Sequence, residues 1–393
     1  MLLFYKAFIL FRIAQFVIVA LAPEPFDTSS LILVAEYMEG KVPHYPTFMI
    51  TILNKLMAWD SVYFLKLAIS GISYEHEWVF GPLWWRFLSL ITSIMPNPDI
   101  YDVLLVSIVI NNLCLIASAY MINQLARTIL KNQFVKSFVG PKFPEYASLL
   151  IIIQPSGIFS LIGYSESSSQ LLCYTALLLR QKSLGTTRIR NKHLYEISGF
   201  LFALAYGLRS NCLLYGIVYI YDMIKFPYYR SKLTALFTGL LLFFSLIFSI
   251  YVPYQEYCPD RGEWCHSLTK SLTSYAQNHY WGIGFLKYYT SNNIPNFLFA
   301  MPQIFVLFLS LCVFSNWSVI RGEWLVGVIY LIIQIFWMHI QVINRVSTFL
   351  PLHILYVAYL LSINRSLGKA ISAWWTFWVL LQTGLFACFL PPA

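Results

Sequence analysis

Residues 233–253, LTALFTGLLLFFSLIFSIYVP, decide the fold class, because the stretch carries no charged side chain. A helix needs about 20 apolar residues to cross roughly 30 Å of hydrocarbon, and this stretch meets that requirement. The rest of the chain has the same character. Of its 393 residues, 59% are hydrophobic and only 11% are charged, and the mean hydropathy is +0.65. This composition excludes a water-soluble domain and predicts an all-α polytopic membrane protein.

Further apolar stretches predict about ten crossings in total. They are residues 1–22, 103–123, 147–163, 167–181, 195–221, 296–320, 324–340, 346–362 and 371–389. Residues 83–95 are short and end in Met-Pro-Asn-Pro, which favours a re-entrant or interfacial helix over a simple crossing. We interpret residues 1–22 as an uncleaved first helix, because Arg12 interrupts the apolar run and Pro23 follows it.

Basic residues gather in four loops, at 127–142, 180–192, 225–232 and 365–369. The positive-inside rule places these loops, and with them the N-terminus, in the cytosol. Topology therefore accounts for the net charge of +9, and a nucleic-acid surface is the weaker interpretation, so no nucleic-acid partner is expected.

Residues 1–393 are predicted to form one transmembrane domain with two large non-cytosolic loops, 23–80 and 254–295. Acidic residues concentrate in the first loop, as Glu24, Asp27, Glu36, Glu39, Asp60, Glu75 and Glu77. Within that loop, residues 54–70 show helical spacing of apolar side chains and are expected to lie along the membrane interface.

Asp60 is the most informative of these acids, because it directly follows Trp59 at the predicted membrane boundary. A carboxylate held near lipid is costly unless it has a partner or a role, which suggests a general base or an ion site. The alternative is structural: Asp60 caps a helix and Trp59 is an interfacial anchor.

Several motifs occur in a characteristic order along nearly the whole chain. They are residues 59–64 (WDSVYF), 71–77 (GISYEHE), 80–82 (FGP), 154–159 (QPSGIF), 163–167 (GYSES), 207–211 (GLRSN), 280–285 (YWGIGF), 294–297 (IPNF) and 339–342 (HIQV) with Arg345. Taken together, this ordered set resembles the glycosylphosphatidylinositol (GPI) mannosyltransferase II family, the PIG-V type.

The resemblance implies a GT-C type transmembrane helix bundle that acts in the endoplasmic reticulum membrane. It implies transfer of the second mannose, in α-1,6 linkage, from dolichyl phosphate mannose to the GPI precursor at the lumenal face. The donor is a substrate, so no cofactor is expected. The partners implied are these two lipid substrates, the membrane and a small membrane-protein subunit.

A sugar on a lipid phosphate already has a good leaving group, so one base that accepts the acceptor hydroxyl proton can suffice. Asp60 is our candidate for that base, with Glu75 and Glu77 as further catalytic candidates. His76 is expected to orient the acceptor or to hold Asp60, unless it is a solvated loop residue. Asp27 is a weaker substrate-binding candidate, since it also suits a helix cap.

Arg209 and Arg345 are the candidates for binding the donor phosphate, because guanidinium pairs with phosphate at two points. For Arg345, snorkelling to lipid headgroups is the open alternative. Glu166 is expected to pair with one of the two arginines, as part of the site or as a purely structural ion pair. The family motifs add four more substrate-binding candidates: Trp59, Asn211, Trp281 and Gln341.

Cysteine, histidine and sequon positions bear on disulfide formation, metal binding and topology. Cys258 and Cys265 lie outside the apolar stretches and are expected to form a disulfide in an oxidising lumen. The histidines lack ligand spacing and no Asp-x-Asp pair occurs, so we expect no metal. The sequons at Asn316 and Asn364 fall on the predicted cytosolic side and should carry no glycan.

Three other functions fit a hydrophobic multispan chain. A different GT-C transferase that uses another dolichyl phosphate sugar would share most features. A secondary transporter should show two repeated halves, and no convincing repeat occurs here. A non-catalytic scaffold subunit would leave the acid concentrated in residues 23–80 without explanation.

Overall fold

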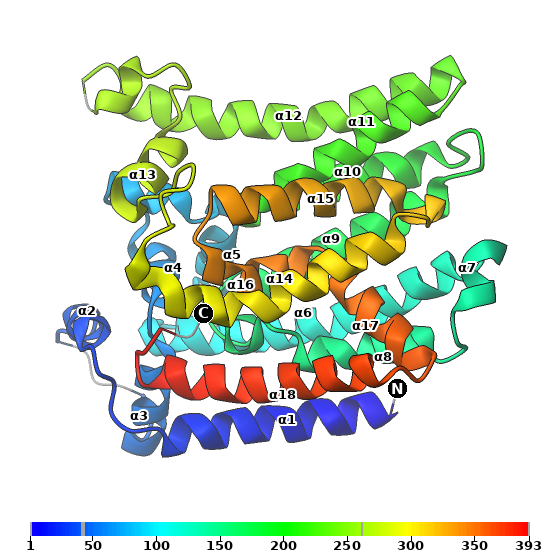
Figure 1. Ribbon diagram of the computed structural model, residues 1–393. Helices are drawn as coiled ribbons and strands as arrows, with labels where there is room; N and C mark the ends of the chain where they lie inside the picture. The colour runs from blue at the N-terminus through cyan, green and yellow to red at the C-terminus, as the bar shows by residue number, and fades with distance from the viewer. Residues whose placement is uncertain (1, 41–43, 261, 392–393) are drawn as a thin grey trace.

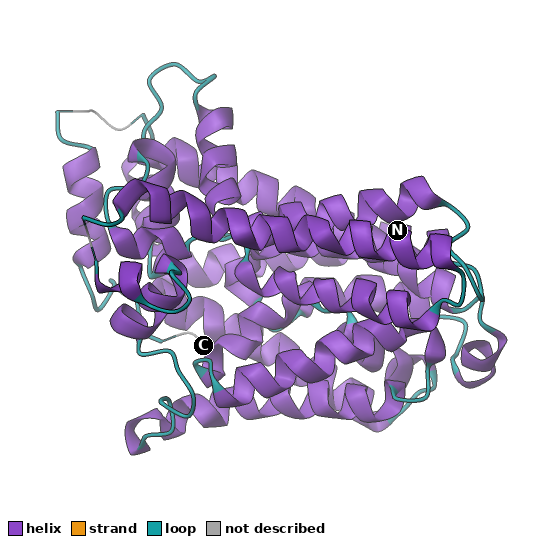
Figure 2. Ribbon diagram, turned by 90° about the horizontal axis from the view of Figure 1, so that it is seen from above, coloured by secondary structure: helices purple, strands orange, loops and turns teal. Residues whose placement is uncertain are grey.

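The computed structural model describes residues 2–40, 44–260 and 262–391, and these residues form helices and loops without a named β-strand (Figures 1 and 2). Within these described residues, six helical segments are long and apolar enough to cross a membrane, and a seventh forms if a bent pair counts as one span. The long helices are α1 (Leu2–Leu21), α6 (Ile100–Ile129), α12 (Tyr229–Tyr257), α14 (Ile294–Phe314), α15 (Arg321–Phe336) and α18 (Ser366–Ala387). The chain is therefore an all-α polytopic membrane protein, as predicted.

The bent pair contains the chain from η8 to α17 and turns by 79° between its halves. Its parts are η8 (Ile340–Val342), α16 (Ile343–Val346), η9 (Ser347–Phe349) and α17 (Leu352–Ser362). Irregular backbone at this depth is tolerated where protein covers it, and Ile343, Phe349 and Leu350 are fully buried.

Three of the ten expected crossings are not continuous apolar spans. They correspond to α8 (Phe143–Leu150) with η2 (Ile151–Ile153) and η3 (Gly157–Ser160), to α9 (Glu166–Ser183), and to α10 (Lys192–Leu208) with η4 (Ser210–Tyr215) and α11 (Gly216–Lys225). Helix α9 packs between α6 and α10 and buries most of its polar side chains. A helix surrounded by protein needs no lipid-compatible surface, which is why the hydropathy of α9 is low.

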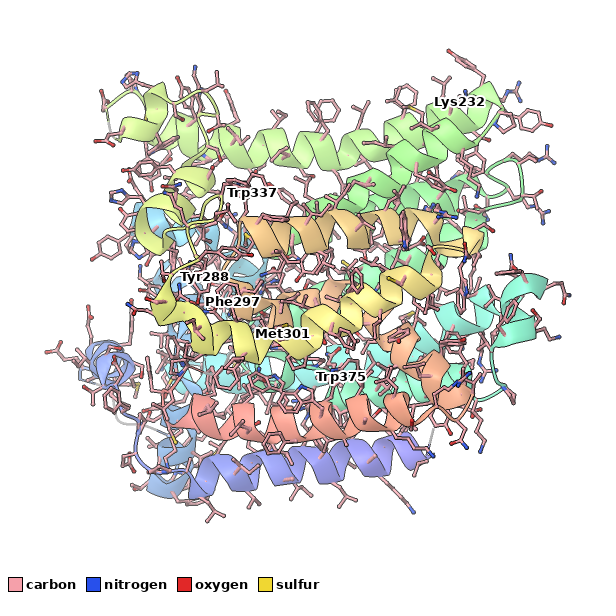
Figure 3. All side chains as sticks on the ribbon, in the orientation of Figure 1. Lys232, Tyr288, Phe297, Met301, Trp337 and Trp375 are labelled. Atoms are coloured by element: carbon pink, nitrogen blue, oxygen red, sulfur yellow. A yellow bond between two sulfur atoms is a disulfide. The ribbon has the colours of Figure 1, made fainter. Side chains whose placement is uncertain are left out.

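The four basic loops lie at the same end of the bundle as the start of α1 (Figure 1). We call this the proximal end and the opposite one the distal end. Lys232, in the third basic loop, lies at the proximal end, whereas Trp337 lies at the distal end (Figure 3). The structure thus brings the basic loops to one side, while the assignment of that side to the cytosol stays a prediction.

Buried charges at the proximal end join four helices. Arg180 of α9 donates to both carboxylate oxygens of Asp222 on α11, at 2.7 and 2.9 Å, and to Glu323 on α15 at 3.0 Å. The Tyr195 hydroxyl of α10 also donates to Asp222, at 2.8 Å. Each ion is at most 2% exposed, so this pairing offsets a large desolvation cost.

Short helices build the distal end. They are α2 (Ser29–Tyr37), α3 (Thr47–Leu56), α4 (Asp60–Ser70), η1 (Glu75–Val79), α5 (Pro82–Thr92), η5 (Glu263–His266), α13 (Leu272–Trp281) and η6 (Ser291–Asn293), while α7 (Gln133–Phe138) and η7 (Ser318–Ile320) lie at the proximal end. Helix α5 is too short to cross, in line with the interfacial or re-entrant helix expected for residues 83–95.

Helix α4 is held by burial of one face. Phe64, Leu65 and Leu67 are at most 4% exposed and join a hydrophobic cluster with Trp84 of α5 and Leu104 of α6. Each such side chain contributes about 1.5–3 kcal/mol when removed from water. This packing fixes the position at which α4 begins, and α4 begins at Asp60.

Cys258 and Cys265 form a disulfide in the second distal loop, as predicted. The loop encloses Trp264, which is fully buried beside Tyr254 and Leu272. Trp78 of η1 donates to the Tyr257 hydroxyl at 3.1 Å. The disulfide loop therefore packs on the segment that carries Glu75, His76 and Glu77.

Candidate active site

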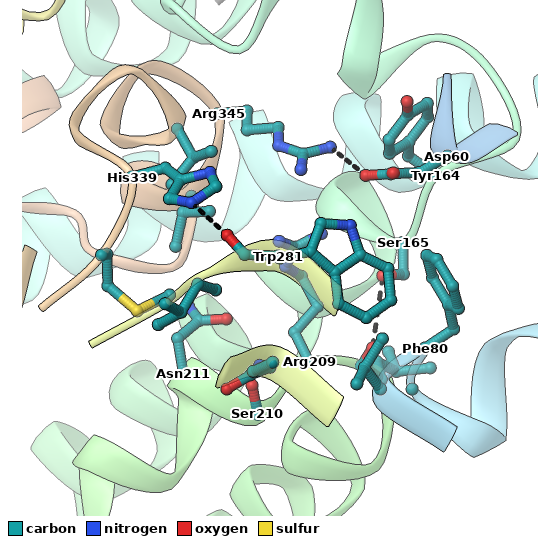
Figure 4. Close-up of a pocket in the computed structure, with 18 of the residues that line it drawn as sticks. Asp60, Phe80, Tyr164, Ser165, Arg209, Ser210, Asn211, Trp281, His339 and Arg345 are labelled. Carbon is teal, nitrogen blue, oxygen red and sulfur yellow. Dashed lines mark hydrogen bonds and ion pairs between the residues drawn. The ribbon is translucent and has the colours of Figure 1, made fainter. Parts of the chain in front are cut away.

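A cavity of about 210 Å³ lies at the distal end. Its wall comes from α4, the start of α5, the 164–165 turn, the break between α10 and η4, α13, and the η8–α16 segment (Figure 4). The polar and charged residues among those that line it are Asp60, Tyr164, Ser165, Arg209, Ser210, Asn211, Gln277, His339 and Arg345. The cavity is smaller than the roughly 300–1,000 Å³ sites of drug-sized ligands, so it accommodates the reacting groups of a substrate and not a whole lipid.

Asp60 is placed at the first position of α4, where the helix dipole favours a negative charge. Its Oδ2 accepts a hydrogen bond from Arg345 Nη1 at 2.9 Å (Figure 4). The preceding residue, Trp59, has a φ of 55°, a left-handed conformation that non-glycine residues rarely adopt. Strain of this kind persists only where the surrounding packing imposes it, and here it directs the chain into α4 at Asp60.

Arg345 lies on α16, in the first half of the bent pair (Ile340–Phe349). Its guanidinium sits over the rings of Phe159 and Tyr164, 5.1 and 5.4 Å from their centroids. These contacts and the bond to Asp60 orient the guanidinium toward the cavity. Snorkelling to lipid headgroups is not what the structure shows for this side chain.

Arg209 lies at the break between α10 and η4, as its sequence context suggests. Its Nη1 is 2.6 Å from Glu166 Oε1, and the Glu166 side chain is fully buried. The predicted pairing of Glu166 with one of the two arginines is thereby confirmed. Within the described residues, Arg209 Nε and Asn211 Nδ2 are buried and lack a hydrogen-bond partner.

The turn before Glu166 is fixed by hydrogen bonds from three other elements. Asn111 of α6 donates to the carbonyls of Ile162 and Tyr164, the latter at 2.9 Å. Trp84 Nε1 donates to the Gly163 carbonyl at 2.7 Å. These bonds satisfy backbone groups in an irregular segment and hold Tyr164 at the cavity wall.

Gly81 lets the start of α5 approach the Arg209 turn closely. A Cβ at this position would lie 1.9 Å from the carbonyl oxygen of Leu208, which is a clash with backbone. Any side chain at residue 81 would therefore push α5 away from the turn that carries Arg209.

His339 lines the cavity between Met338 and η8. Its Nε2 is 2.7 Å from the carbonyl oxygen of Trp281, which can only accept, so Nε2 carries the proton. Burial, together with the nearby charge of Arg345, lowers the pKa of His339 from its ordinary value of 6.5. A neutral imidazole thus ties the bent pair to the end of α13.

The predicted site residues separate into three groups. Five of them line the cavity: Asp60, Arg209, Asn211, Trp281 and Arg345. Glu166 lies behind Arg209, and the ring of His76 packs against Trp281 at a centroid distance of 6.3 Å. The remaining candidates are Asp27, Trp59, Glu75, Glu77 and Gln341, which are not among the described residues that line the cavity.

The remaining candidates make other contacts, away from the cavity wall. Glu77 is 1% exposed, forms an ion pair with Lys66 and accepts hydrogen bonds from the Ser73 and Tyr74 amides. Asp27 is exposed, and hydrogen bonding to the Ser29 side chain and to the Ser29 amide, the latter at 2.7 Å, lowers the pKa of its carboxyl.

Trp59 stacks on Phe389 at 5.1 Å, and Glu75 lies beside Gly262 of the disulfide loop. Gln341 lies in η8, next to the cavity-lining Val342. Their proposed roles in catalysis and binding stay predictions.

Sequence reasoning did not select Tyr164, Ser165, Ser210, Gln277 or His339 as site residues. Four of these lie inside or next to the quoted motifs, so the motifs themselves were the available signal. Gln277 lies outside every motif, on α13, and reaches the cavity only through folding. Within the described residues, no group of three or more His, Cys, Asp or Glu side chains is arranged to hold a metal ion.

Comparison with known proteins shows the family to which the chain belongs. The model of the mannosyltransferase (PIG-V) family matches residues 2–326. The GPI mannosyltransferase 2 of Saccharomyces cerevisiae is 35% identical, over 98% of this chain and 98% of the yeast protein. The GPI mannosyltransferase 2 of Candida albicans is 34% identical, over 99% and 98% respectively. That of Schizosaccharomyces pombe is 30% identical, over 87% of this chain and 74% of the relative.

Proposed function

Because the chain belongs to the mannosyltransferase (PIG-V) family, we propose that it is a GPI mannosyltransferase that adds the second mannose, in α-1,6 linkage. The donor in this proposal is dolichyl phosphate mannose and the acceptor is the GPI precursor. Transfer takes place at the lumenal face of the endoplasmic reticulum membrane, with the distal end of the bundle in the lumen.

Asp60 carries this proposal, because it is the one carboxylate among the described residues that line the cavity. Its side chain is 29% exposed there, whereas that of Glu166 is fully buried. In the reaction, the Asp60 carboxylate accepts the proton of the acceptor hydroxyl. The hydroxyl oxygen then bonds to the anomeric carbon of mannose, the bond from that carbon to the phosphate oxygen breaks, and dolichyl phosphate leaves.

Arg209, Asn211 and Arg345 form the phosphate subsite. The Nε of Arg209 and the Nδ2 of Asn211 are buried donors without partners among the described residues. A buried donor without an acceptor costs about 1–3 kcal/mol, so both atoms favour a ligand that brings oxygen acceptors. A phosphate does so, and guanidinium also stabilises the charge that grows on the leaving phosphate.

Arg345 has a second effect through its contact with Asp60. A guanidinium that touches both the base and the leaving phosphate holds the two reacting ends at a set separation. The long Arg345 side chain is suited to this because its position is fixed by the rings of Phe159 and Tyr164. We propose no metal ion and no cofactor for the reaction. The small membrane-protein subunit implied by the family resemblance remains part of the proposal, without an assigned contact surface.

The direct test uses membranes from cells that lack their own second mannose transferase. The chain is expressed there and supplied with dolichyl phosphate mannose and the GPI precursor that carries one mannose. We expect a product with one more mannose, released by an α-1,6-specific mannosidase. Transfer from a nucleotide sugar in the absence of dolichyl phosphate, or transport of solute without transfer, would refute the proposal in favour of another transferase or a transporter.

A further inference from the structure

A continuous row of aromatic rings runs outward from the cavity at the distal end. Phe80 and Trp281 line the cavity, with ring centroids 6.3 Å apart. Tyr63 stacks on Phe80 at 5.1 Å with an interplanar angle of 17°. Tyr280 adjoins Trp281, with ring centroids 6.1 Å apart, and Tyr74 joins the group through His76.

His76 lies at the centre of this surface. Its ring centroid is 5.8 Å from that of Tyr63, 5.7 Å from Tyr74 and 5.3 Å from Tyr280. We call Tyr63, Tyr74, His76 and Tyr280 the aromatic shelf. The shelf joins three elements, α4, η1 and α13, of which η1 and α13 pack against each other.

The shelf exposes large rings on short distal elements and not on the long spans. The exposed fraction is 62% for Tyr74, 50% for Tyr280 and 38% for Tyr63. An exposed patch of aromatic rings of this kind marks a binding surface, since ring faces left in water contribute nothing to folding. An anchor in the membrane interface is the competing explanation.

The charges under the shelf are already paired. The Lys66 ammonium lies 5.1 Å from the centre of the Tyr74 ring and is bound to Glu77, which is itself buried. The shelf itself therefore offers ring faces with hydroxyl and imidazole groups at their edges. The arginines of the site lie inside the cavity instead, so a phosphate headgroup has its partners there and not on the shelf.

A pyranose ring has the complementary chemistry. Its axial C–H groups form an apolar face that packs against an aromatic ring, while its hydroxyls reach polar atoms at the edge of that ring. The shelf also lies close to the candidate base, because Tyr63 follows Asp60 by one turn of α4. The shelf therefore adjoins the cavity that Asp60 lines, through the stacking of Tyr63 on Phe80.

We propose that the aromatic shelf is the acceptor subsite and binds a sugar ring of the acceptor glycan, while the arginine-lined cavity holds the donor. This inference rests on the proposed function and extends it by separating the two substrates. Donor mannose enters between the arginines, and the acceptor approaches from the shelf past Phe80 and Trp281.

The test is a double substitution, Tyr74→Ala with Tyr280→Ala, assayed with a short-chain analogue of the precursor that carries one mannose. We expect the acceptor KM to rise about five- to tenfold, with kcat and the donor KM within about twofold of wild type. Tyr74→Phe with Tyr280→Phe keeps the rings and should retain most of the acceptor affinity. Tyr228→Ala with Tyr229→Ala, two exposed tyrosines at the proximal end, is the matched control.

Equilibrium binding of the same analogue to the purified protein separates the two proposals. The wild type could bind the analogue more tightly than the double alanine variant but not transfer mannose. That result would refute the proposed function and would support the shelf as the binding site of the acceptor glycan. If transfer proceeds and the alanine variant has unchanged acceptor KM and affinity, the shelf is not the acceptor subsite. Equal rises in donor and acceptor KM, or a loss of abundance alone, would also overturn it in favour of a structural or anchoring role.

Discussion

Arg345 Nη1 and Asp60 Oδ2 are 2.9 Å apart, although 285 residues separate them in the chain. The contact joins the first turn of α4 to α16, in the first half of the bent pair. It brings the candidate base and a candidate phosphate ligand to one wall of the cavity, and the following predictions depend on that arrangement.

Asp60→Asn should abolish most of the transfer activity. The amide keeps the shape of the side chain but does not accept the hydroxyl proton, so we expect kcat to fall by about 100-fold or more. Activity is measured in membranes at equal protein abundance, with the exposed Asp260→Asn as a matched distal control. Full activity in the Asp60 variant would remove this residue from the role of base.

Arg209→Gln should destabilise the protein, because it leaves the buried Glu166 carboxylate without its partner. Breaking a buried pair in this way costs about 3–5 kcal/mol, and we expect a lower Tm in detergent. Breaking the exposed pair Lys192–Glu196 with Lys192→Gln should cost less than about 1 kcal/mol.

A double variant separates stability from binding at the same site. Arg209→Gln combined with Glu166→Gln removes both charges, so the Tm should recover while the donor KM stays raised. If the donor KM also returned to the wild-type value, Arg209 would be a structural residue only.

The disulfide Cys258–Cys265 should stabilise the distal loop by about 2–4 kcal/mol. Replacing both cysteines by serine lowers the Tm, and a reductant then has no further effect. Cys312→Ser, which removes an exposed free cysteine, is the control and should leave the Tm unchanged. Alkylation of Cys258 and Cys265 in the unreduced protein would contradict this prediction.

Stability should fall as the pH drops below about 6.5, in part through His339. The folded protein lowers the pKa of His339 from its ordinary value of 6.5, so the unfolded chain binds the proton more readily. The contribution of His339 to stability is complete at pH values above 6.5 and is lost as the pH falls toward the lowered pKa of His339 in the folded protein. The Tm difference between pH 7.5 and 5.5 should be smaller in His339→Gln, and an identical difference would exclude this contribution.

The sequons at Asn316 and Asn364 should carry no glycan in eukaryotic cells, because both follow helices that end at the proximal end (Figure 1). The positive control is Ser267→Asn, which completes a sequon with Thr269 in the disulfide loop and should be glycosylated. A glycosidase-sensitive mass shift at Asn316 or Asn364 would reverse the orientation of the chain.

The sequence predicted the membrane class and the six continuous apolar spans found among the described residues, because lipid contact imposes an apolar surface on those helices. It did not predict the length of α9, which is surrounded by protein and buries polar side chains. It also missed the break that ends α8 and η2 at Ile153. Asp60 was predicted from its place next to Trp59, Arg209 from its place in a break that contains glycine, and Arg345 from its place in a polar turn. All three line the cavity.

Chain distance to Asp60 did not decide which acidic side chains line the cavity. Glu77 lies close in sequence, yet the backbone of η1 turns its carboxylate inward to Lys66. Gln277 and His339 lie far along the chain and reach the cavity because α13 packs on η1 and the bent pair folds back beneath it. The sequence around Glu77, Gln277 and His339 predicts neither the inward turn of the first nor the place of the other two at the cavity.

The sequence by itself determined the apolar spans, the gathering of basic residues in four loops, the disulfide cysteines and the family. These properties depend on residue type and order alone. Apolar spans follow from contact with lipid, basic loops from the positive-inside rule, and the disulfide from the presence of two cysteines in one loop. Only the tertiary structure decided which carboxylate faces the cavity, which arginine pairs with Glu166 and where the aromatic rings form a surface. Those relationships join segments that are far apart in the chain, 285 residues for Asp60 and Arg345, and packing at the distal end, not local preference, sets the distances between them.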